Sequence, residues 1–101
     1  VILASGHLGN WEIAAQMIST LKPLAGVRRP MSNPLTDRLL HLRNPSSQFR
    51  IVPKNDAADP ARFLEILKRG EILALMIDQH GGERGMIVNF FNRPASTHSY
   101  W

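Results

Sequence analysis

The chain has 101 residues, of which 44% are hydrophobic and 20% are charged, a composition that argues against a disordered or fibrous protein. It contains no cysteine, which excludes disulfides, thiolate metal sites and a thiol nucleophile. Lys and Arg outnumber Asp and Glu by 12 to 8. Because most of the basic residues are Arg, we expect anionic partners such as phosphorylated lipids. Because the basic residues are dispersed along the chain, we expect no nucleic-acid partner.

The chain begins with a predicted strand and a predicted helix. Residues 1–4 form a continuous apolar run, which is typical of a strand buried on both faces of a parallel sheet. Asn10 is a favourable helix N-cap, Glu12 follows in the first turn, and apolar residues then recur at helical spacing. Lys22-Pro23 ends this helix.

The middle of the chain predicts two weaker strands around a second helix. Residues 24–27 and 50–53 are short segments that favour strands. Between them, Asn33-Pro34 combines a cap with a proline at the first helical position, and the helix stops before Pro45.

The last third contains the clearest helix and the clearest strand. Asp59-Pro60 repeats the cap-plus-proline signal, and Phe63, Leu64, Ile66 and Leu67 are expected to form the inward face of a helix that ends at Gly70. Six consecutive apolar residues at 72–77 predict a central strand, and residues 86–91 predict one more.

The alternation of predicted strands and helices along the chain predicts an α/β fold in which a parallel or mixed sheet is flanked by helices. Ligands of such folds bind beyond the carboxyl ends of the strands. Two polar clusters fall there: residues 5–12 follow the first strand, and residues 78–84 follow the central one. We therefore expect the functional site at this edge of the sheet.

His7 and Glu12 are the candidate catalytic pair. Histidine transfers protons near neutral pH, and a carboxylate bound to one ring nitrogen fixes its tautomer. Five residues apart, the two side chains would point about 140° apart on a continuous helix. They can meet only if the chain turns between them, which Gly6 and Gly9 favour. The alternative is an ordinary loop histidine beside an acid that stabilises the helix start.

The segment Gly6-His7-Leu8-Gly9-Asn10-Trp11-Glu12 resembles the His-x4-Glu/Asp motif of the late acyltransferases of lipid A biosynthesis, the lauroyl and myristoyl transferase family. The resemblance extends over nearly the whole chain. Further matching pieces occur in the same order: Arg29-Pro30, Asn33-Pro34-Leu35, Val52-Pro53-Lys54, residues 67–70, Asp78-Gln79, Arg84-Gly85 and Phe90-Phe91.

The resemblance implies a glycerolipid-acyltransferase-like fold and an O-acyl transfer. His7 would be the general base, oriented by Glu12, and the acyl chain would pass from an acyl carrier protein thioester to a hydroxyl of a lipid A precursor or similar membrane glycolipid. No cofactor is expected. Two alternatives stay open: a non-catalytic lipid-binding relative, and the same chemistry on another acceptor such as a phosphatidylinositol mannoside.

Three further residues are candidates for substrate binding. Arg29 and Arg84 match the family pattern and suit acceptor phosphates. Asp78, at the end of a buried strand, is expected to orient a substrate group or to pair with an arginine. Asp78, His80 and Glu83 also suggest a metal cluster, but no further ligand is evident, so we predict no metal site.

Residues 1–101 are interpreted as one partial catalytic domain, a fragment of a longer protein with both flanks missing. No apolar run approaches the roughly 20 residues that span a bilayer. Membrane contact is therefore expected to be peripheral or to come from a missing N-terminal anchor. By resemblance, the location is the cytoplasmic face of the bacterial inner membrane. The part that measures the acyl chain is expected in the missing flanks.

Overall fold

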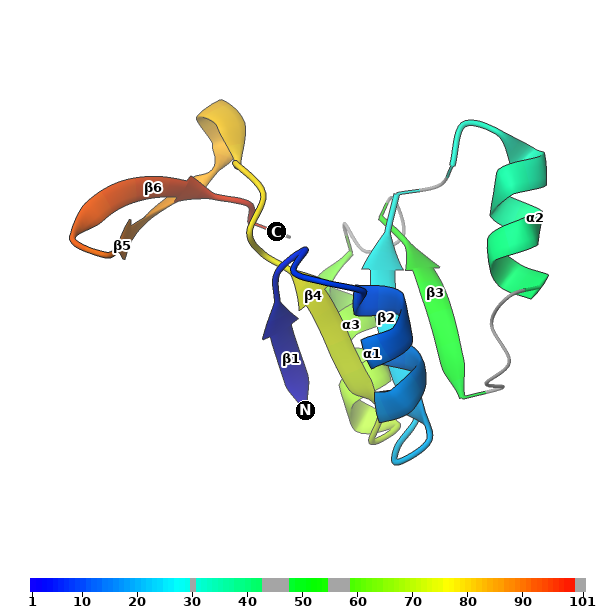
Figure 1. Ribbon diagram of the computed structural model, residues 1–101. Helices are drawn as coiled ribbons and strands as arrows, with labels where there is room; N and C mark the ends of the chain where they lie inside the picture. The colour runs from blue at the N-terminus through cyan, green and yellow to red at the C-terminus, as the bar shows by residue number, and fades with distance from the viewer. Residues whose placement is uncertain (30, 43–47, 55–58, 100–101) are drawn as a thin grey trace.

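The computed structural model describes residues 1–29, 31–42, 48–54 and 59–99, so the predicted helix end at Pro45 and the family-like Pro30 lie outside it. Four strands form a parallel sheet in the order β1-β4-β2-β3. Their bounds are β1 (Ile2–Ser5), β2 (Leu24–Arg28), β3 (Phe49–Pro53) and β4 (Ile72–Met76). The predicted α/β class is confirmed (Figure 1).

Helices cover both faces of this sheet, with α1 (Trp11–Ser19) in front and α3 (Pro60–Lys68) behind in Figure 1. Both begin at the predicted caps: Asn10 Oδ1 accepts from the Ile13 N–H at 3.1 Å, and Asp59 Oδ1 accepts from the Ala61 N–H at 2.9 Å. The remaining helix, α2 (Pro34–Leu42), is drawn beyond β3. Within the described ranges, none of the helices has the length and apolarity needed to cross a bilayer.

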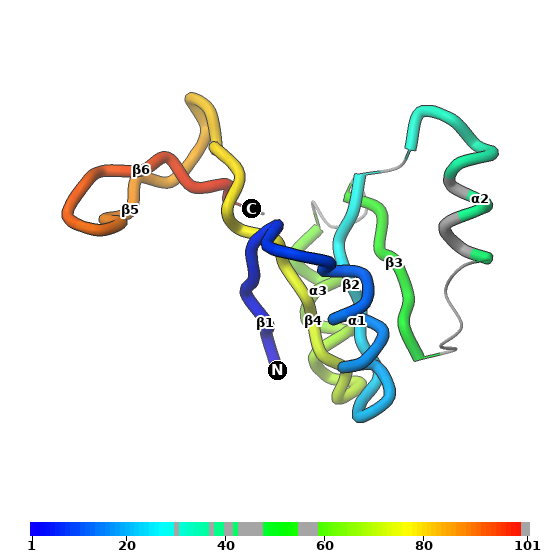
Figure 2. Tube along the Cα trace, viewed as in Figure 1, coloured from blue at the N-terminus to red at the C-terminus, as the bar shows by residue number. Residues whose placement is uncertain are grey.

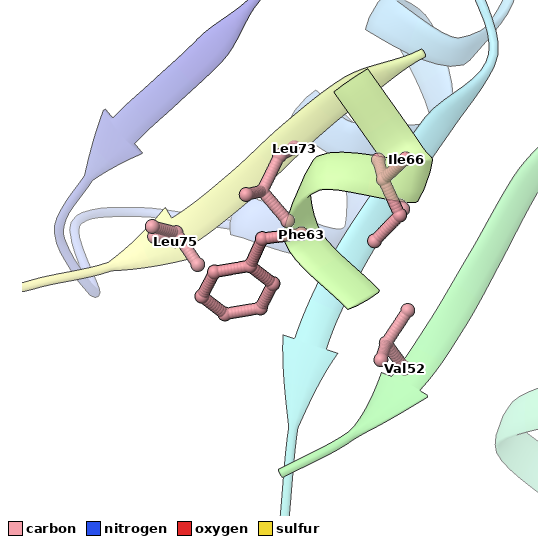
Figure 3. Close-up of a cluster of buried hydrophobic side chains, with 6 residues drawn as sticks. Val52, Phe63, Ile66, Leu73 and Leu75 are labelled. Carbon is pink, nitrogen blue, oxygen red and sulfur yellow. The ribbon is translucent and has the colours of Figure 1, made fainter. Parts of the chain in front are cut away.

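The hydrophobic core lies between α3 and the sheet (Figure 3). Phe63 and Ile66 of α3 are 5% and 2% exposed. They pack against side chains that point to the same face from three strands: Ala25, Val52, Leu73 and Leu75. The prediction that Leu64 faces inward is wrong, because its side chain is 55% exposed; one residue after Phe63, it is rotated about 100° around the helix.

The expectation for the first strand is also wrong in one respect. β1 was predicted to be buried on both faces, but it is the outer strand of the sheet, and Ile2 is 56% exposed. By contrast, β4 is central, as predicted, since it lies between β1 and β2. An apolar run thus identified the strand but not its position.

A second, antiparallel sheet of two strands follows, formed by β5 (Met86–Phe90) and β6 (Arg93–Thr97). The turn between them is Phe91-Asn92, in which both residues have positive φ, 49° and 59°, as tight hairpins require. A 3-10 turn, η2 (Gly82–Arg84), precedes the hairpin, which extends away from the parallel sheet (Figure 1). β5 was predicted and β6 was not.

Candidate active site

The site is built where β1 and β4 end. These neighbouring strands are parallel, with Ser5 opposite Met76, and the Ile77 N–H donates to the Ser5 carbonyl at 2.9 Å. The segments that follow therefore leave the same edge of the sheet (Figure 2). This arrangement brings His7 next to Asp78, although 71 positions separate them in the sequence.

Asp78 holds His7 through two contacts. The ring Nδ1 of His7 lies 2.7 Å from Asp78 Oδ1, and the His7 backbone N–H donates to Oδ2 at 2.6 Å. Gly6 makes room for this approach, because a Cβ at this position would lie only 3.1 Å from Oδ2. One carboxylate thus fixes both the ring and the backbone of the histidine.

These hydrogen bonds determine the protonation pattern of the pair. The backbone hydrogen bond from His7, followed by the side-chain one, lowers the pKa of Asp78 below its ordinary value of 3.8. An ionised carboxylate only accepts hydrogen bonds, so Nδ1 carries a proton, and in the neutral imidazole Nε2 is then the proton acceptor. Both side chains are about two fifths exposed, at 42% and 41%, so a substrate hydroxyl can reach the ring. The arrangement is suited to general base catalysis.

Glu12, the partner predicted from the sequence, is placed differently. It lies in the first turn of α1, half-buried, and no hydrogen bond or ion pair joins it to His7 among the described residues. Gly9, with φ of 62°, turns the chain between the two residues as expected. The carboxylate in contact with His7 is therefore Asp78, while the catalytic roles assigned to His7 and Glu12 stay predictions.

Positive side chains gather at the ends of β2 and β3. Arg29 follows β2 and is exposed, and the Lys54 N–H donates to the Arg28 carbonyl at 2.9 Å. Burial, and then the charge of Arg29, lowers the pKa of Lys54. Lys54 Nζ also contacts His98 Nε2. Lys54 and His98 were not predicted as site residues; the signal for Lys54 was its position at the carboxyl end of a strand.

Arg84 and the suggested metal residues lie on the loop after β4. Arg84 is exposed in η2, and no hydrogen bond or ion pair in the described part of the chain links it to His7 or Asp78. His80 Nδ1 accepts from the Gly82 N–H at 3.0 Å. The described residues contain no group of three or more acidic or histidine side chains that is placed to hold a metal ion.

An apolar cavity opens beside His7. It lies between α1 and the sheet and contains about 650 Å³ of space, counting the part open to solvent. Ser5 and Leu8, which flank the Gly6-His7 turn, are part of its wall. The other lining residues are Leu3, Trp11, Ala14, Ala15, Ile18, Leu24, Gly26, Val27, Arg28, Phe49, Ile51, Ala74 and Met76.

A second and wider hollow borders the same pair. It lies between the parallel sheet and the hairpin, and its wall includes Ser5, Gly6 and Asp78 together with Val88 and Phe90 of β5. Ser5 contributes to both spaces. Asp78 thus lines the second hollow, and the residues that flank the Gly6-His7 turn line the first.

Comparison with known proteins identifies the family of the chain. The family described as bacterial lipid A biosynthesis acyltransferase matches residues 1–100. No curated protein matches the chain. Because the family match covers nearly every residue, including both members of the His7–Asp78 pair, the chain belongs to the bacterial lipid A biosynthesis acyltransferases.

Proposed function

We propose that this chain transfers a fatty acyl group from an acyl carrier protein thioester to a hydroxyl of a lipid A precursor or similar glycolipid, with His7 as general base. The observation that carries the proposal is the 2.7 Å contact between His7 Nδ1 and Asp78 Oδ1 in a chain of an acyltransferase family. In the proposed site, Asp78 orients the base, and Glu12 is a second carboxylate at the start of α1.

The reaction needs only one base in the site. Nε2 of His7 takes the proton of the acceptor hydroxyl, whose oxygen attacks the thioester carbon. The C–O bond forms, the C–S bond breaks, and the imidazolium returns its proton to the departing thiolate. The negative charge of Asp78 stabilises the imidazolium while it exists. No acyl-enzyme intermediate is involved.

The two spaces beside His7 suit two lipid substrates. The cavity under α1 is lined mainly by apolar side chains, which suits a hydrocarbon chain. We assign the acyl chain of the donor to it, because Ser5 and Leu8, on either side of the Gly6-His7 turn, are part of its wall. The acceptor approaches from the hairpin side, and Arg29 and Arg84 are the proposed contacts to its phosphates. The proposed place of reaction is the cytoplasmic surface of the inner membrane.

Replacement of the proposed base tests this function. In the intact protein, His7→Ala should lower acyl transfer from an acyl carrier protein thioester to a lipid A precursor by about a hundredfold or more. The matched control is His80→Asn, which changes a nearby histidine and keeps an acceptor for the Gly82 N–H. Near-normal transfer by a folded His7→Ala protein would refute the assignment.

The same assay separates the competing interpretations. A non-catalytic lipid-binding relative would bind acyl thioester and acceptor but transfer nothing, even with His7 and Asp78 present. If the acceptor is another lipid, such as a phosphatidylinositol mannoside, the assay would show transfer to that lipid and none to the lipid A precursor. Mass spectrometry of the product lipids identifies the acceptor in either case.

A further inference from the structure

A groove between α3 and β3 lies on the face of the sheet opposite the cavity under α1. The buried side chains of Val52 and Ile66, which belong to the hydrophobic core, are part of its wall (Figure 3). The charged residues of the wall come from β3, from α3 and from the cap that ends α3: Arg50, Arg62, Glu65 and Arg69. We call this space the arginine groove.

Positive charge exceeds negative charge in the arginine groove. Arg50 Nε contacts Glu71 Oε2 at 2.9 Å, and Arg62 Nη1 contacts Glu65 Oε2 at 3.3 Å. Within the described ranges, the side chain of Arg69 makes no hydrogen bond or ion pair. Like charges that lie close together repel each other. An anion bound in the groove would therefore be stabilised by more than one arginine.

The guanidinium groups keep donors for an acceptor from outside the chain. Among the described residues, Glu71 contacts Nε of Arg50 and neither of its terminal nitrogens, and the Arg50 side chain is 43% exposed. The pair of Arg62 and Glu65 is exposed on both sides, at 55% and 54%, so it contributes little and is easily exchanged for another contact. A guanidinium group donates in a planar fork that matches carboxylates. The groove therefore suits an acidic protein surface.

The arginine groove reaches the catalytic edge of the sheet. Pro53, the last residue of β3, is part of its wall, and Arg50 lies about 10 Å before it at about 3.3 Å per residue. Three spacings between neighbouring strands separate β3 from β1, which leads to His7, or about 14 Å at about 4.8 Å per spacing. A partner bound in the groove must therefore present its reacting group on a long, flexible arm.

We propose that the arginine groove binds an acidic face of the acyl carrier protein that supplies the donor thioester. This inference rests on the proposed function. Charge complementarity selects an acidic partner, and the prosthetic arm of a carrier protein brings the thioester across the carboxyl ends of the strands to His7. The hairpin, from which the acceptor approaches, extends beyond β1, whereas the groove lies at β3 (Figure 1). Donor protein and acceptor lipid therefore use different sides of the enzyme.

The test uses the intact protein and two donors that carry the same acyl group. One is the acyl carrier protein thioester; the other is acyl pantetheine, which keeps the thioester but has no protein. Arg62→Gln/Arg69→Gln removes two charges at exposed positions, so the fold should be kept. The KM for the carrier protein donor should rise by about tenfold with kcat unchanged, because exposed charges act mainly on association. Acyl pantetheine should react at the wild-type rate.

Lys22→Gln/Arg93→Gln is the matched control, because it removes the same charge from two exposed positions outside the groove. It should leave the KM for both donors unchanged. An equal rise in KM for the control would mean that net charge governs the effect, and would overturn the inference. An equal loss of activity with both donors in the Arg62→Gln/Arg69→Gln protein would overturn it as well, because docking affects the protein donor alone.

Salt and charge-conserving substitutions give two further readouts. Raising the salt concentration to about 0.5 M should raise the wild-type KM for the carrier protein and remove its difference from the Gln variant, because salt screens exposed charges. Arg62→Lys/Arg69→Lys keeps both charges and should restore most of the affinity. A KM that is insensitive to salt in the wild type would contradict an electrostatic contact.

A binding measurement separates this inference from the proposed reaction. Binding of acyl-loaded carrier protein to a His7→Ala protein is measured by calorimetry, with and without Arg62→Gln/Arg69→Gln. Weaker binding with the groove substitutions supports the inference even if the wild type transfers nothing, in which case only the proposed function fails. Binding that these substitutions leave unchanged, or no binding at all, overturns the inference, while His7-dependent transfer leaves the function standing.

Discussion

Asp78 accepts hydrogen bonds from both the ring Nδ1–H and the backbone N–H of His7, so one carboxylate fixes the tautomer of the base and the course of its loop. An amide at position 78 has one oxygen and one NH2 group and satisfies only one of the two donors. We expect Asp78→Asn to lower kcat by about 10²- to 10⁴-fold, the range found when such an orienting carboxylate is lost. Steady-state kinetics with acyl carrier protein thioester measures the change.

Glu12→Gln is the informative comparison for that variant. Because Glu12 makes no described hydrogen bond or ion pair with His7, its loss should reduce kcat far less than Asp78→Asn. A larger effect of Glu12→Gln would show that the carboxylate favoured by the sequence motif, and not the one in contact in the structure, orients the base.

Protonation of Asp78 should lower the unfolding free energy of the protein only at low pH. The pKa of Asp78 is lowered by the hydrogen bonds from His7, so its ionised form is favoured in the folded protein. That stabilisation is fully present above the unfolded pKa, near 3.8, and is lost as pH falls through the lower folded value. The difference in unfolding free energy between wild type and Asp78→Asn should be present at about pH 5 and should shrink as the pH falls below 3.8. Urea denaturation at each pH measures it; a difference that disappears already near pH 6 would contradict the prediction.

Gly81 should tolerate no side chain. A Cβ there would lie 2.5 Å from the Gly85 Cα and 2.6 Å from the Thr97 carbonyl oxygen, and these backbone atoms cannot move aside easily. We expect Gly81→Ala to destabilise the protein by about 1–3 kcal/mol, the usual effect of overpacking, and to displace the start of the hairpin. Denaturant unfolding measures the loss.

The adjacent glycine provides the control for Gly81→Ala. Gly82 has φ of 64° but open space around its Cβ position, and Asn tolerates this conformation better than other residues. Gly82→Asn should therefore be close to neutral. Equal losses in the two variants would show that backbone conformation, and not the close contact at Gly81, limits substitution in this loop.

The elements that follow from local signals were predicted well. Asn10 and Asp59 cap α1 and α3 as expected, because a cap depends only on a side chain and the N–H groups two or three residues later. β6 was missed because Pro94 argues against a strand and Phe91 is an unusual residue for positive φ. Neither residue reveals that β6 is stabilised by its pairing with β5.

The partner of His7 was beyond sequence reasoning for a topological reason. The sequence placed His7 and Asp78 at the same edge of the sheet, but it did not give the strand order. β4 lies next to β1 although two other strands separate them in the chain. Without that neighbourhood, the sequence favoured Glu12, which completes the His-x4-Glu motif that begins at His7.

The alternation of side chains along β2 divides the sheet into two compartments with different tolerance for mutation. Ala25 is enclosed in the core against α3, whereas Gly26 lies in the wall of the cavity under α1, close to the Phe49 ring. A larger side chain at Ala25 would disturb the core, whereas a larger side chain at Gly26 would meet the Phe49 ring and reduce the space under α1.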